Sequence, residues 1–163
     1  MSFKSVMLKL FLLIGLLAAV LSLSACSFIS RIIVANESND RIQIRYVVKK
    51  HNRDYQAFLP VDPKVQLISD LDESDVPWRE LSASAFTFNA DTGTAVITLA
   101  PNEAVEIERI SNGRCSELDR HRDEFDIEEI SITGPSGAMR LTGEQVLNSF
   151  VARRKQTCVL TYR

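Results

Sequence analysis

Apolar and polar side chains alternate along several short segments of this chain, and turn-forming residues separate those segments. In 41–48 every second position is apolar, namely Ile42, Ile44, Tyr46 and Val48, and the positions between them are polar except for Val47. A period of two places alternate side chains on opposite faces of a β-strand, so one face is buried and the other contacts water. The alternation therefore predicts half-buried strands rather than amphipathic helices.

The same argument predicts strands at 31–35, 86–88, 95–99, 105–110, 127–133, 138–141 and 157–162. Asp91-Thr92-Gly93 is a hairpin turn signal because glycine adopts positive φ without steric cost. The segment 55–84 contains Pro60, Pro63 and Pro77, which favour a loop or an edge strand because proline cannot donate to a β ladder. With 41–48, eight segments are predicted to form strands.

One helix is predicted late in the chain, beginning at Thr142. Thr142 and Gln145 have the spacing of a capping box, in which each side chain satisfies a free amide of the first turn. The residues expected on its apolar side are Val146, Leu147, Phe150 and Val151. Its expected end carries the cations Arg153, Arg154 and Lys155, which oppose the negative end of the helix dipole.

These elements predict a mainly β fold, a two-layer antiparallel β sandwich with one helix before the last strand. A small α+β fold, with the helix packed across one sheet, is the alternative. No repeat or second-domain boundary interrupts the chain, so 31–163 is interpreted as a single β-rich domain.

The first 25 residues have the organisation of a secretory signal peptide. Lys4 and Lys9 precede an apolar stretch of 14 residues, Leu10–Leu23. A membrane-spanning helix needs about 20 residues, whereas the apolar region of a signal peptide has about 7–15. The length therefore favours a cleaved leader over a membrane span.

The leader ends in Leu23-Ser24-Ala25-Cys26, which resembles the lipobox of bacterial lipoproteins. The resemblance covers the leader alone. It implies that Cys26 carries diacylglycerol on its sulfur, that cleavage removes 1–25, and that the new amino group is acylated, with 26–30 as a short tether. Two or more acyl chains suffice for stable attachment to a bilayer. A plain signal peptide with a chance cysteine and an uncleaved anchor remain alternatives.

Ser27 bears on which membrane holds the protein. In the lipoproteins that the leader resembles, aspartate after the lipidated cysteine commonly marks retention at the inner membrane, and Ser27 departs from that mark. The resemblance therefore implies an outer-membrane protein whose domain faces the periplasm, in a cell with two membranes.

Removal of the leader leaves 138 of the 163 residues, with 17 Lys and Arg against 21 Asp and Glu and a net charge of −4. This length is enough for one domain with a hydrophobic core. Nucleic-acid binding requires concentrated positive charge, so a mildly acidic domain is not expected to bind nucleic acid. No polybasic segment adjoins the anchor.

With Cys26 assigned to lipid, the chain retains one pair of cysteines, Cys115 and Cys158. Disulfides persist in oxidising compartments, so we expect the pair to form a bridge. A loop of 43 residues between them corresponds to roughly 4 kcal/mol of chain-entropy stabilisation. Two unpaired core thiols are the alternative, and the absence of zinc-ligand spacing disfavours a metal site.

No motif marks a reaction. His51 lies in a polar turn and His121 among charged residues, without the spacing of metal ligands. No Gly-x-Ser-x-Gly motif occurs. Acidic residues gather at 70–75 and 119–129, but neither cluster has the glycine-containing pattern of a calcium loop. We therefore expect no catalytic residue, metal or cofactor, and interpret both clusters as solvated loops.

Trp78 is the one tryptophan of the chain and stands among charged residues. It is expected to pack partly into the core, or alternatively to anchor a partner, since tryptophan is enriched at interface centres. The sequence thus predicts a non-enzymatic, membrane-anchored module that binds a protein or supports envelope assembly. The alternative is a binder of small molecules or glycans, or a weakly marked hydrolase, with a pocket between sheet and helix.

Overall fold

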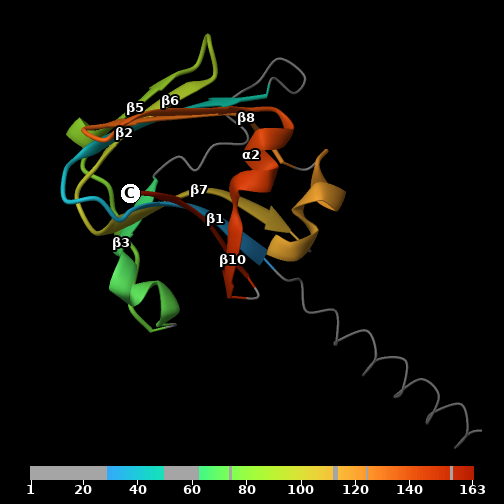
Figure 1. Ribbon diagram of the computed structural model, residues 1–163, viewed down its shortest axis with the longest axis horizontal. Helices are drawn as coiled ribbons and strands as arrows, with labels where there is room; N and C mark the ends of the chain where they lie inside the picture. The colour runs from blue at the N-terminus through green and yellow to red at the C-terminus, as the bar shows by residue number, and fades with distance from the viewer. Residues whose placement is uncertain (1–28, 50–62, 74, 112–113, 124, 155) are drawn as a thin grey trace, which may run out of the picture.

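The computed structural model describes residues 29–49, 63–73, 75–111, 114–123, 125–154 and 156–163. Two β-sheets face each other in two layers (Figure 1), which confirms the predicted β sandwich. The six-stranded sheet has the order β10 (Val151–Arg154), β11 (Thr157–Tyr162), β1 (Ile29–Asn36), β7 (Glu103–Ser111), β3 (Lys64–Leu67) and β4 (Arg79–Glu80). The five-stranded sheet has the order β5 (Phe86–Asn89), β6 (Thr94–Leu99), β2 (Ile42–Val48), β8 (Ile127–Gly134) and β9 (Gly137–Thr142).

Neighbouring strands are antiparallel except β1 and β11, which run parallel. β1 begins at Ile29, so the last two residues of the expected 26–30 tether belong to this strand. Three 3-10 helices complete the described structure: η1 (Ile68–Asp72), η2 (Ala83–Ala85) and η3 (Cys115–His121).

The predicted alternation in β2 is confirmed by burial. Ile42, Ile44, Tyr46 and Val48 are all at most 3% exposed and face the other sheet. From the opposite layer, Ile32 and Val34 of β1 pack against them. The core therefore lies between the sheets and is built mainly of β-branched side chains.

Helix α2 (Glu144–Ser149) connects the two layers and is shorter than predicted. Gly143, with φ 54°, precedes it, and only one bond of the expected capping box is present: the Thr142 amide donates to Gln145 Oε1 at 3.4 Å. Phe150 is already extended and packs edge-on against Phe125, with ring centroids 6.1 Å apart. The assignment of Val151, Arg153 and Arg154 to the helix was wrong, because 151–154 form β10 and pair with β11; Lys155 lies outside the described residues.

The expected disulfide is present between Cys115 and Cys158, whose Cα atoms are 5.3 Å apart. It joins η3 to the buried strand β11 and contributes to the core. Both cysteines are largely buried, so the bridge fastens the 114–126 connection to the six-stranded sheet.

A second, smaller cluster covers the outer face of the six-stranded sheet. Its buried members are Ile33, Ala35, Leu71, Ala104 and Val159, and Ile68 and Trp78 pack against them. Leu71 and Ile68 come from η1, so this short helix shields part of the outer face. The rest of that face, toward the start of β1, contains a groove.

Candidate functional site

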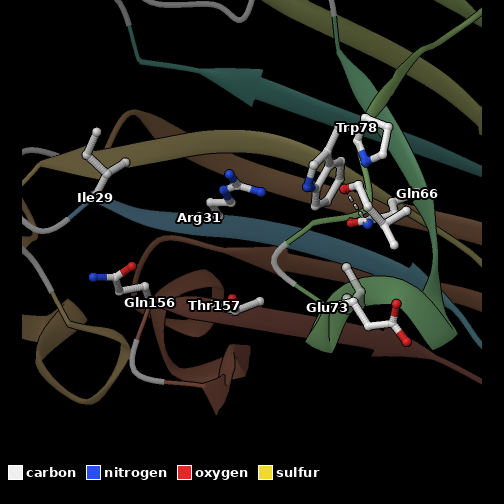
Figure 2. Close-up of a pocket in the computed structure, with 10 residues that line it drawn as sticks. Ile29, Arg31, Gln66, Glu73, Trp78, Gln156 and Thr157 are labelled. Atoms are coloured by element: carbon white, nitrogen blue, oxygen red, sulfur yellow. Dashed lines mark hydrogen bonds between the residues drawn. The ribbon is translucent and has the colours of Figure 1, made fainter.

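A groove of about 850 Å³ lies on the outer face of the six-stranded sheet, at the beginning of β1. Its floor is formed by the parallel strands β1 and β11, where Arg31 and Thr157 are register partners. Ile29 and Gln156 lie at one end, and Trp78 and Glu73 at the other (Figure 2). The groove therefore follows the strands, between an exposed strand start and the η1 region.

The wall that carries Trp78 is held to the sheet by Gln66 of β3. This side chain is 4% exposed, and its Nε2 donates to the carbonyl oxygens of Asp70, at 3.3 Å, and Val76, at 3.1 Å. A buried amide that satisfies two loop carbonyls restrains the loop, because breaking either bond leaves a polar group unpaired. Gln66 of β3 thus ties Asp70 and Val76 to the sheet.

The second wall is η1, which is fastened across the sheet to the edge strand β10. Arg153 Nε donates to Asp72 Oδ2 at 3.3 Å. Leu71, the preceding residue, points into the sheet and contributes to the outer cluster. Residues distant in sequence therefore fix both walls of the groove.

Trp78 and Arg31 form the centre of the groove. The Arg31 Cζ lies 5.4 Å from the centroid of the indole ring, which is within cation–π distance. Figure 2 shows the guanidinium between Ile29 and the indole. The sequence left two roles for Trp78, and the structure shows partial burial against the outer cluster together with a position on the groove.

A charge cluster adjoins the floor on the β7 side. Arg31 and Arg109 are register partners in the β1–β7 ladder, and both contact Glu106, whose side chain is 5% exposed. Arg109 Nε donates to Glu106 Oε1, and Arg31 Nε lies 3.6 Å from Oε2. Two guanidinium groups therefore share one buried carboxylate, which leaves positive charge on this part of the face.

Sequence reasoning missed this cluster. Arg31 begins a β-branched run, and the alternation in 105–110 placed Arg109 on the same face as Val105 and Ile107, so neither arginine was selected from the sequence. Their juxtaposition was not readable, because it depends on β1 lying beside β7, about 75 residues away in sequence. The charged residues around Trp78 were noted, but not the arginine that contacts its ring.

Described acidic side chains of the 70–75 and 119–129 clusters make hydrogen bonds and ion pairs at the surface. Asp70 and Asp72 lie in η1, where Ser69 Oγ donates to Asp70. Glu129 of β8 accepts hydrogen bonds from Arg45 and Arg140, and the Arg140 bond is the main reason that its pKa is lowered. Within the described ranges, no three His, Cys, Asp or Glu side chains are grouped as metal ligands.

Several sequence-based expectations fall outside the described residues. These are the leader, Cys26, Ser27, His51 and the side chain of His121. Among the helices that the structure describes, none combines the length and apolar character required to cross a membrane.

A buried titratable pair lies between the sheets, apart from the groove. Burial raises the pKa of Glu108 to about 8, and the Asp126 amide donates to its Oε1 at 2.9 Å. Burial also raises the pKa of Tyr46, with a further contribution from the negative charge of Glu108. In the described part of the chain, Tyr46 Oη and Glu108 Oε2 have no hydrogen-bond partner.

The groove can bind a partner by stacking, apolar contact and charge, because it combines indole, guanidinium and aliphatic groups. No protein-family model, curated protein or solved structure matches the chain.

Proposed function

We propose that this protein is a bacterial lipoprotein, anchored through acylated Cys26, whose domain binds an envelope protein in the groove between Arg31 and Trp78. The outer membrane, with the domain facing the periplasm, is the proposed location, on the basis of the lipobox and Ser27. The proposed activity is binding and not catalysis.

The observation that carries the binding proposal is the contact between Trp78 and Arg31. Tryptophan and arginine are among the residues most enriched in binding hot spots. Here they stack on each other at the centre of a groove whose open end has Ile29, a large apolar side chain that is 46% exposed. The groove lies on the outer sheet face, and not between sheet and helix, where a small-molecule pocket was the alternative.

The walls give the groove the rigidity that a binding site needs. Gln66 holds the Trp78 wall, and the Arg153–Asp72 ion pair holds η1. A partner that enters this groove meets side chains already restrained, so little conformational entropy is lost on binding. This supports recognition of a segment that is itself exposed on the partner, such as a loop.

Site-specific crosslinking in intact cells tests the groove. A photoreactive phenylalanine analogue replaces Glu73, an exposed groove residue beyond Trp78, and as a matched control replaces Thr98, an exposed residue on the outer face of the other sheet. We expect a discrete protein adduct from position 73 that is absent from position 98 and is lost when Trp78→Ala is added. Identical adducts at both positions, or adducts that survive Trp78→Ala, would contradict the proposal.

Acylation is tested separately by the variant Cys26→Ala. We expect it to abolish incorporation of labelled palmitate and to release the protein from membranes or stall its maturation. Intact-mass analysis of the native protein is expected to show a diacylglycerol-modified, N-acylated Cys26 as the first residue. A free amino terminus or a retained leader would refute the anchor while leaving the groove experiment interpretable.

A further inference from the structure

We infer that Arg31, in the groove, and Arg109, beside it on β7, dock on the phosphate groups of anionic phospholipids, so that the anchored domain stands on the bilayer with Trp78 just above the headgroups. This inference rests on the acylation of Cys26 proposed above. It adds an orientation that the anchor alone does not impose, because a lipid tether permits the domain to rotate.

The chain between the anchor and the groove is short. Ile29 lines the groove and follows Cys26 by three residues. Three residues span at most about 10 Å, whatever their conformation. The start of β1 is therefore held within about 10 Å of the lipidated residue, and the groove end at Ile29 is the part of the site nearest to the membrane.

The distribution of charge on the domain also favours this orientation. The chain downstream of the leader has a net charge of −4, so an anionic surface repels the domain as a whole and favours any orientation that presents cations. Beside Ile29, Arg31 and Arg109 lie opposite each other and share the single buried carboxylate of Glu106. Like charges in direct opposition destabilise a ladder unless an anion lies between them. The Arg31 and Arg109 side chains are 42% and 53% exposed, so an anion in solution or at a surface can approach both.

The two ends of the groove differ in charge. Its cation, Arg31, lies between Ile29 and Trp78, whereas its acid, Glu73, lies beyond Trp78 (Figure 2). Arginine binds phosphate in two-pronged geometry, and an exposed isoleucine is compatible with the boundary between headgroups and acyl chains. The Glu73 end then remains free for the protein partner.

Trp78 provides the measurement, because it is the sole tryptophan of the chain and lies 5.4 Å from Arg31. The purified, acylated protein is incorporated into nanodiscs that contain a dansyl-labelled phosphatidylethanolamine. Energy transfer from Trp78 to the headgroup label is compared between phosphatidylcholine discs and discs made from phosphatidylcholine and phosphatidylglycerol in equal amounts. We expect stronger transfer in the anionic discs, and loss of the difference at about 1 M salt, where the Debye length is about 3 Å.

Variants identify the groups responsible. Arg31→Gln and Arg109→Gln are each expected to reduce the docked population in anionic discs about fivefold, the effect of one cation near an anionic surface. Arg31→Lys retains the charge and is expected to retain most of the transfer. The control is Arg163→Gln, because Arg163 follows β11 at the opposite end of the same sheet and is 81% exposed.

Two outcomes would overturn the inference: equal transfer in both lipids for the wild-type protein, or equal losses for Arg31→Gln and Arg163→Gln. Inorganic phosphate added to neutral discs is expected to leave the transfer unchanged; a change as large as that caused by anionic lipid would overturn the assignment to a bilayer. Failure of the protein to enter discs at all, with an unacylated mass, would instead refute the proposed anchor.

Discussion

Glu108 of β7 lies opposite Ile32 of β1, on the face of the ladder that is turned toward the other sheet. The pairing continues with Ile33 opposite Glu106, so that Ile107 is an extra residue in β7. Such a bulge changes which side chains face inward. Glu106 therefore meets arginines on the outer face, while Glu108 is enclosed in the sandwich beside Tyr46.

The buried carboxyl of Glu108 is expected to make the domain less stable as pH rises. The pKa of Glu108 is raised from 4.5 to about 8 in the folded protein, because burial disfavours the charged form. Between these two values the unfolded chain has released the proton and the folded protein retains it. The free energy of unfolding therefore falls as pH rises through this window, by about 1.4 kcal/mol per pH unit from this group, and levels off above about pH 8.

The variant Glu108→Gln tests this relationship, because its amide replaces the protonated carboxyl and can still accept from the Asp126 amide. We expect the variant to be more stable than the wild-type protein at pH 8 and less different from it at pH 5, in denaturant titrations at both values. As a control, Glu129→Gln removes a partly exposed carboxylate whose pKa is lowered, and it should not stabilise the protein at pH 8. Parallel pH profiles of wild type and Glu108→Gln would contradict the prediction.

The bulge also explains why the sequence predicted β2 more accurately than β7. β2 was predicted in detail because its inward face, Ile42, Ile44, Tyr46 and Val48, is apolar without interruption. In β7 the alternation places Ile107 and Glu108 on opposite faces, but pairing with β1 inserts an extra residue there, and that pairing is not local information. The same limit hid β10: the 151–154 segment continues a helical pattern, and only the neighbouring β11 draws it into a strand.

The candidate site, likewise, was only partly predictable from the sequence. Trp78 was selected from the sequence because a lone indole among charges is distinctive. Its contact with Arg31 depends on Gln66 and on the order of strands in the sheet, which single-sequence patterns do not encode. The disulfide was predictable because it required only a count of cysteines and a compartment.

Reduction of the Cys115–Cys158 bridge is expected to destabilise the domain substantially. The bridge closes a loop with a sequence separation of 43, for which the chain-entropy estimate is roughly 4 kcal/mol. Thermal unfolding of the purified protein with and without reductant should show a lower Tm in the reduced sample, by about 10 °C or more for a domain of this size. The double variant Cys115→Ala/Cys158→Ala should be insensitive to reductant, and an unchanged Tm on reducing the wild-type protein would contradict the prediction.

Gly134 at the end of β8 allows the close approach of Tyr162. A Cβ at position 134 would lie 2.8 Å from Tyr162 Oη and 2.9 Å from Ile42 Cγ2, and Tyr162 Oη also donates to the Gly137 carbonyl at 2.9 Å. Gly134→Ala is therefore expected to cost about 1–3 kcal/mol through overpacking, measured by denaturant unfolding.

A double-mutant cycle separates this clash from a general effect of losing glycine. In the background Tyr162→Ala the ring that the new methyl group meets is absent, so Gly134→Ala should cost markedly less. Equal costs in both backgrounds would show that Tyr162 is not the source.

Asn36 links two turns, the one after β1 and the one after β6, from a fully buried position at the end of β1. Its Nδ2 donates to the carbonyl oxygens of Asp40, at 2.8 Å, and Ala100, at 2.9 Å, while Oδ1 accepts from the amide and hydroxyl groups of Ser38. Asp40 is exposed and both donated bonds are partly buried, so water can replace part of what is lost. Asn36→Ala is therefore expected to destabilise the domain by about 1–3 kcal/mol, whereas Ser38→Ala removes a more exposed hydroxyl and should cost less.

The variant Asn36→Asp distinguishes lost donors from lost volume. Its side chain is nearly isosteric and retains the acceptor for Ser38, but above its pKa it directs negative charge at the Asp40 and Ala100 carbonyl oxygens. We expect stability near that of Asn36→Ala at neutral pH and partial recovery in acid, where the protonated carboxyl can donate once. If Asn36→Asp matched the wild-type protein at neutral pH, the two donated hydrogen bonds would not be what holds the turns together.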